Sequence, residues 1–140
     1  MARSTDTREE LLLLYQITVA DLSYFKTQQW SVTNYALLIF TALVGVAQLL
    51  KPLSSNEHWF LSAVAVAGMA FALVILSKLQ KSISVRQSRL AATRDNFSDS
   101  FKQAWAAEVK GHEYIHSIFF LSATVIIGGI LAIWLVGFRI

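Results

Sequence analysis

The sequence contains no cysteine and only one proline among its 140 residues. Without cysteine the chain forms no disulfide and offers no thiolate to a metal ion, so it suits a reducing or an oxidising compartment equally well. It also lacks a glycine-rich phosphate-binding loop, a Ser/His/Asp set and a pair of catalytic carboxylates. We therefore expect a protein that is not an enzyme and that uses no cofactor.

Charge is absent from three long stretches of the chain. Each stretch reaches the roughly 20 apolar residues that cross a bilayer at about 1.5 Å per residue. With 55% hydrophobic residues and a mean hydropathy of +0.51, the chain is predicted to be an all-α integral membrane protein with three transmembrane helices. The stretches without charge are Thr27–Leu50, His58–Ser77 and Tyr114–Phe138.

The first 30 residues are predicted to form an amphipathic helix. Leu11, Tyr15, Leu22 and Phe25 follow the spacing of three or four residues that defines one apolar helix face. This helix packs on its own bundle, lies in the membrane interface or docks a separate protein. No glycine or proline stops it at residue 30, so it either ends there or continues into the first span.

The remaining chain divides into three predicted regions. Residues 31–77 form a transmembrane hairpin that turns at Pro52 and the polar residues after it. Residues 78–113 form basic amphipathic helices, drawn as 78–92 and 97–110 with a capping box from Asn96 to Asp99. Residues 114–140 form the third transmembrane helix.

Lysine and arginine are unevenly distributed along the chain. Ten of the twelve lie in residues 1–30 and 78–113, whereas the 51–57 turn has Lys51 and the C-terminus has Arg139. The positive-inside rule places the first two segments in the cytoplasm. The turn and the C-terminus are then expected on the outer side.

Small and polar residues within the spans indicate helix contacts. Small residues allow the backbones of two helices to approach closely, in the same chain or in another subunit of a homo-oligomer. Asn34 and Gln48 are costly to bury in lipid, so they find a partner across a helix interface or line a water-filled pore in an oligomer. The candidate packing residues are Ala63, Ala67, Gly68, Ala72, Gly128 and Gly129.

The basic residues of 78–113 admit three interpretations. Attraction to anionic lipid headgroups is the simplest, and a cytoplasmic partner protein or an acidic ligand is the next. Contact with nucleic acid is the least favoured, because the segment also carries four acidic residues and has no RNA-binding motif. The residues assigned to lipid or partner contact are Lys78, Lys81, Arg86, Arg89 and Arg94.

Residues 112–116 spell the H-E-x-x-H pattern of zinc metalloproteases. On a helix, His112 and His116 lie on one face and can hold Zn²⁺ while Glu113 activates a water molecule. A third ligand is needed, yet no Asp, Glu, His or Cys follows residue 116. The preferred interpretation is a polar collar where the third span enters the headgroups, and a pH-sensitive or non-catalytic metal site is the alternative.

A small cytoplasmic helical part joined to a few packed spans resembles the small transmembrane effectors of bacterial anti-phage defence systems. The resemblance implies a homo-oligomer in the inner membrane that disturbs membrane integrity or potential when triggered through its cytoplasmic helices. A passive anchor or accessory subunit that recruits a soluble partner is the alternative from another class. A zinc hydrolase built on Glu113 is the third.

Overall fold

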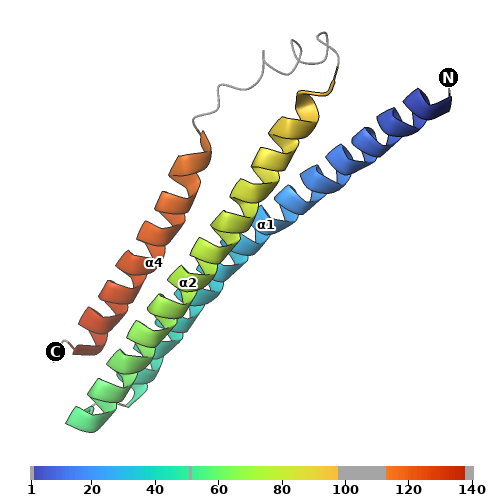
Figure 1. The fold of residues 1–140 in the computed structure, drawn as a ribbon. Coiled ribbons are helices and arrows are strands. Elements are labelled where there is room, and N and C mark those ends of the chain that lie inside the picture. Colours follow the sequence, from blue (N-terminus) through green and yellow to red (C-terminus); the bar gives the residue numbers. More distant parts are fainter. Residues whose placement is uncertain (1, 51, 98–112, 138–140) are drawn as a thin grey trace.

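The computed structural model describes residues 2–50, 52–97 and 113–137, with the side chains of residues 9–50, 52–97 and 117–137. These residues form three helices, α1 (Ala2–Leu49), α2 (Ser55–Arg94) and α4 (Glu113–Gly137), and the described parts of the chain contain no strand (Figure 1). All three helices are long and apolar enough to cross a membrane. The predicted all-α class with three apolar helices is confirmed.

Helix α1 is a single unbroken rod. Its 48 residues extend over about 70 Å at about 1.5 Å per residue. The N-terminal amphipathic helix and the first predicted span are thus one element, which decides between the two possibilities that the sequence left open. The local sequence permits this continuity, since neither proline nor glycine occurs before Gly45 and nothing in α1 stops the hydrogen-bond ladder near Trp30.

Helix α2 likewise joins two regions that the sequence divided. Residues 78–94 are not a separate helix but the continuation of the second apolar stretch. The helix ends close to the predicted break, where the Asn96 side chain donates a hydrogen bond to the carbonyl oxygen of Ala92. Two parts of the prediction lie outside the described residues. They are Asp99, the predicted capping partner of Asn96, and the predicted helix 97–110 from residue 98 onward.

The turn between α1 and α2 begins the second helix with a capping box. The Ser54 hydroxyl accepts a hydrogen bond from the Glu57 backbone N–H, and the Glu57 carboxylate accepts one from the Ser54 backbone N–H at 2.8 Å. These hydrogen bonds from Ser54 lower the pKa of Glu57. Helix α2 therefore starts at a position set by its own sequence.

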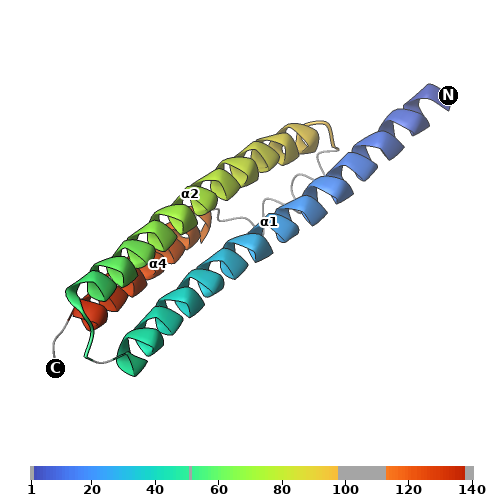
Figure 2. The same cartoon turned by 90° about the horizontal axis from the view of Figure 1, so that it is seen from below.

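Helix α4 packs beside the half of α1 and α2 that is nearest to this turn, as both views show (Figures 1 and 2). We call this part the three-helix section. One core cluster takes two residues from each helix: Ala36 and Phe40 of α1, Ala72 and Leu76 of α2, and Val125 and Ala132 of α4. A second cluster takes one residue from each helix: Ala47, Leu61 and Val136.

Glycines bring α4 close to both of its neighbours. A Cβ atom on Gly128 would lie 2.8 Å from Leu37 Cδ2 of α1, and one on Gly129 would lie 2.8 Å from Met69 Sδ of α2. A Cβ atom on Gly68 of α2 would lie 3.8 Å from Phe40 Cε1 of α1, an ordinary van der Waals distance, so Gly68 faces α1 with less crowding. These small residues serve packing inside one chain, as one of the two predicted alternatives has it.

Candidate functional site

Beyond α4, residues 9–29 of α1 run antiparallel to residues 78–94 of α2 and to residues 95–97 that follow α2, and we call this pair the stalk. Its buried residues on α2 include Ile83 and Leu90, seven positions apart. On α1 a row of buried and half-buried residues alternates at spacings of four and three, which is the repeat of a coiled coil. They are Leu11, Tyr15, Thr18, Leu22, Phe25 and Gln29. The predicted apolar face of α1 thus packs on its own bundle, on α2.

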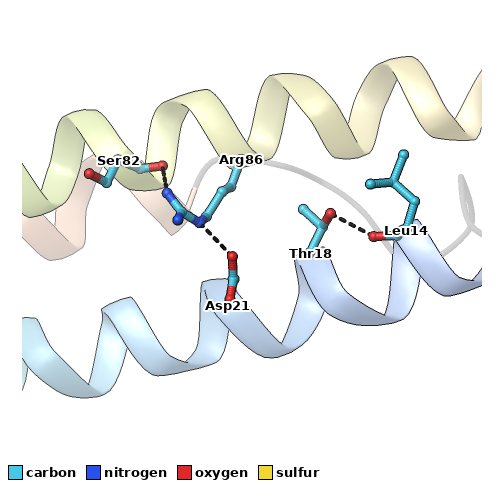
Figure 3. A network of polar contacts seen from close by, with 5 residues as sticks. All are labelled: Leu14, Thr18, Asp21, Ser82 and Arg86. Atoms are coloured by element: carbon cyan, nitrogen blue, oxygen red, sulfur yellow. Dashed lines mark hydrogen bonds and ion pairs between the residues drawn. The ribbon is translucent and has the colours of Figure 1, made fainter.

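An ion pair joins the two helices of the stalk. Arg86 Nε lies 3.1 Å from Asp21 Oδ2, and Arg86 also donates a hydrogen bond to the carbonyl oxygen of Ser82 (Figure 3). The guanidinium lies 4.1 Å from the centre of the Phe25 ring, a cation–π contact. The Arg86 guanidinium is thus engaged inside the chain, and its predicted contact with lipid or a partner stays a prediction for the part of the side chain that remains exposed.

A second polar contact lies where the stalk meets the three-helix section. Gln29 Nε2 donates a hydrogen bond to Gln80 Oε1 at 3.1 Å, and Gln29 is only 4% exposed. The Thr33 hydroxyl donates to the Gln29 carbonyl oxygen one turn later. A buried polar pair of this kind fixes the register of two packed helices. Gln29 was not among the predicted site residues, although its spacing from Leu22 and Phe25 places it on the inner face of α1.

An aromatic contact closes the far end of the stalk. The rings of Tyr15 and Phe97 meet edge to face with centroids 6.0 Å apart. Burial raises the pKa of Tyr15, and the positive charge of Arg94 opposes this change. Arg94 is half-buried, whereas Lys78, Lys81 and Arg89 are exposed. These last three remain available for the predicted contact with lipid headgroups or a partner.

Several predicted site residues face outward from the chain. Asn34 and Gln48 are exposed on α1, so neither lies in a helix interface within the chain. Ala63 and Ala67 are exposed on α2, in contrast to the buried Ala72. These four residues are candidates only for contact with lipid, water or another chain.

The zinc pattern falls at the margin of the described structure. His112 lies outside the described residues, and the side chains of Glu113 and His116, in the first turn of α4, lie outside them as well. Among the residues that are described, no three His, Asp or Glu side chains come together in a way that could hold a metal ion. The zinc interpretation thus gains no support.

A groove runs along the three-helix section between α1 and α4. It has a volume of about 280 Å³. Thr41 is its one lining residue with a polar side chain, and that hydroxyl is already used as a donor to the carbonyl oxygen of Leu37. The lining residues are Leu37, Phe40, Thr41, Val44, Gly128, Leu131, Ala132 and Leu135. An acyl chain or an apolar helix suits such a surface better than a polar substrate does.

The charge swap Asp21→Arg with Arg86→Asp tests the ion pair. Each single change puts like charges side by side, so we expect faster amide hydrogen exchange in the stalk, and the double variant should recover most of the protection. The effect is small, roughly 0.2–1 kcal/mol, because both side chains are partly exposed. Recovery is incomplete because the contact with Phe25 is lost. A double variant that exchanges as fast as the single ones would show that the pair adds nothing.

No protein-family model, curated protein or solved structure matches this chain. The stalk, the outward faces of the helices and the apolar groove are thus the features that bear on function.

Proposed function

We propose that the chain is a homo-oligomeric protein of the bacterial inner membrane that perturbs membrane integrity or potential when its stalk receives a signal. The observation that carries the proposal is the continuity of α1 and α2 from the stalk into the three-helix section. Unbroken helices transmit a tilt or rotation at one end to the other end. A change in tilt or rotation that a partner causes on the stalk is therefore passed directly to the three-helix section.

The proposed orientation places the stalk in the cytoplasm. Three apolar helices supply the membrane section, and the exposed Lys78, Lys81 and Arg89 lie on the stalk side of it. The positive-inside rule then puts the turn at residues 52–54 on the outer side. In this placement the lysines lie beside anionic headgroups, which attract them.

Perturbation of the membrane is proposed to arise between copies of the chain. The core of the three-helix section is filled by side chains such as Leu76 and Val125, both fully buried. In the described part of the chain no charged side chain is buried, so one copy provides no polar path. The outward Asn34 and Gln48 are the polar groups on α1 that could line a path between copies.

The layout resembles that of the small transmembrane effectors of bacterial anti-phage defence systems, and we extend the proposal to that class. A cytoplasmic sensor would favour the active oligomer of such an effector at its normal level, whereas overexpression would favour the oligomer by mass action without the sensor. The sensor would act on the stalk. Its exposed Lys81 and Arg89 lie beyond the three-helix section.

Membrane potential is the measurement that tests the proposal. Cells that overexpress the wild-type chain should lose membrane potential, as read with a voltage-sensitive dye. Gln48→Leu should reduce this loss, because it removes a polar group from the three-helix section. Gln16→Leu is the matched control, because Gln16 is exposed on the stalk. An unchanged potential with the wild-type chain correctly inserted would contradict the proposal.

A passive membrane anchor is the second candidate function. The exposed basic residues of the stalk and the exposed apolar residues of α1, among them Leu12 and Leu13, favour it. An anchor would leave the potential unchanged and would co-purify with a soluble partner in stoichiometric amount. The two functions therefore differ in the same dye experiment.

A further inference from the structure

Helix α1 carries a second heptad face, which we call the outer seam. Each of its residues follows a residue of the inner face by two positions, which is about 200° around a helix with 3.6 residues per turn. The seam therefore lies opposite the face that packs on α2, and its steps of four and three residues repeat the pattern of a coiled coil. Its residues are Leu13, Ile17, Ala20, Tyr24, Thr27 and Ser31.

In the proposed placement the outer seam lies outside the lipid from Leu13 to Tyr24, yet it presents large apolar side chains there. Leu13, Ile17 and Tyr24 are 58%, 52% and 60% exposed. Leu13 lies 14 positions before Thr27, where the stretch without charge begins, so it is about 21 Å from that boundary at about 1.5 Å per residue. Large apolar side chains that repeat along one face of a helix in water mark a surface that another molecule covers.

We propose that the outer seam pairs with the outer seam of a second copy of the chain, as a parallel two-stranded coiled coil. This pairing rests on the membrane insertion that is part of the proposed function, and not on loss of potential. Two copies inserted in the same direction hold their α1 helices parallel and at the same height. Each seam residue then meets its own counterpart, so the membrane itself sets the register.

Charge along the seam is compatible with self-pairing. No seam residue is charged, and the pattern stops at Glu10, the next position toward the N-terminus. In a parallel pair the flanking positions meet five residues apart, which places Gln16 opposite Asp21 and Ser23 opposite Gln28. No two like charges meet in these flanks or along the seam from Leu13 to Ser31, whereas Glu10 would meet its own counterpart, so the pairing is expected to end at Leu13.

The outer seam continues into the three-helix section. From Ser31 it takes a second consecutive step of four residues, to Tyr35. Tyr35, Leu38, Ala42 and Gly45 follow Ser31 on the same face of α1. Nothing lies within 4 Å of a Cβ atom built on Gly45, so a second helix could approach there closely. A dimer would thus be joined along α1 from the stalk into the membrane, and α1 would contact α2 on one face and its counterpart on the other.

Cysteine cross-linking in native membranes tests the pairing, because the chain has no cysteine of its own. Oxidation should join two copies at Leu13→Cys, Ile17→Cys and Tyr24→Cys several-fold more than at Leu12→Cys or Val19→Cys, which are exposed on the sides of the same helix. Same-position links at both Leu13 and Tyr24 require a parallel pair, since an antiparallel pair would set these two ends far apart.

A second variant pair guards against loss of folding. Ile17→Asp should convert the dimer to a monomer in mild detergent without loss of helicity, whereas Val19→Asp should remain dimeric. Equal cross-linking at Ile17 and Val19, no link at any seam position, or a link to a different protein would each overturn the proposal. Seam cross-linking with an unchanged membrane potential would support the dimer and refute membrane perturbation, and loss of potential without seam cross-linking would do the reverse.

Discussion

Gly128→Leu is expected to detach α4 from α1. Even a Cβ atom at Gly128 would lie 2.8 Å from Leu37 Cδ2 and 3.3 Å from Phe40 Cδ2. Leu37 can rotate away from a methyl group, but Phe40 is buried in the core, and a leucine adds three further carbons. Overpacking of this kind costs about 1–3 kcal/mol and occasionally more. We therefore expect α4 to move away from α1 rather than to accommodate the leucine side chain in place.

Cross-linking within one chain measures this separation. Thr41 and Leu131 line the same groove from α1 and α4, so Thr41→Cys with Leu131→Cys should be joined by a short bifunctional thiol reagent. Gly128→Leu should abolish the link. The control Gly45→Leu should keep it, because the space beside Gly45 is open. A link that survives Gly128→Leu unchanged would mean that α4 does not pack through this glycine.

The sequence predicted those parts of the fold that depend on composition and local spacing. Lipid requires long stretches without charge, so three apolar helices could be recognised from such stretches alone. The inner face of α1 was also predictable, because Leu11, Tyr15, Leu22 and Phe25 repeat at the helical period. Both features are encoded within one element and need no knowledge of its neighbours.

Contacts between elements could not be predicted in the same way. Asp21 and Arg86 are 65 positions apart, and which residues meet depends on where the turn begins and how the helices twist. Arg86 looked like one more basic residue of its segment, since exposed and paired arginines have the same local sequence. The partner of Gly128 was likewise undetermined, because a small residue shows that something approaches but not what it is.

The continuity of the helices was a third matter that the sequence left undecided. Near Trp30 and Ser77 the chain has no residue that breaks a helix, so a long rod and two shorter helices agree equally well with local propensity. Packing over the full length of the stalk, through Gln29 with Gln80 and Tyr15 with Phe97, favours the rod. Tertiary contacts thus determined what local signals did not.

Phe40→Ala is expected to be the most destabilising truncation in the three-helix section. Phe40 is 3% exposed, and its ring faces Gly68 of α2 and Gly128 of α4, so it packs against both neighbours of α1. Phe→Ala changes in cores cost about 3–5 kcal/mol, and the lower end applies in lipid, where lost packing rather than transfer from water is the main term. Unfolding by sodium dodecyl sulfate in mixed micelles, followed by circular dichroism, would measure the loss.

Phe71→Ala provides the matched control, since Phe71 of α2 undergoes the same chemical change but is 69% exposed. Its free energy of unfolding should stay near that of the wild type, and equal losses for the two variants would show that Phe40 is not the core residue described above.

The effects of Phe40→Ala and Gly128→Leu on the free energy of unfolding should also be coupled. Phe40→Ala opens space beside Gly128, so Gly128→Leu should cost less in that background than alone. If the losses in free energy of unfolding simply add in the double variant, the leucine introduced by Gly128→Leu clashes with Leu37 and not with Phe40.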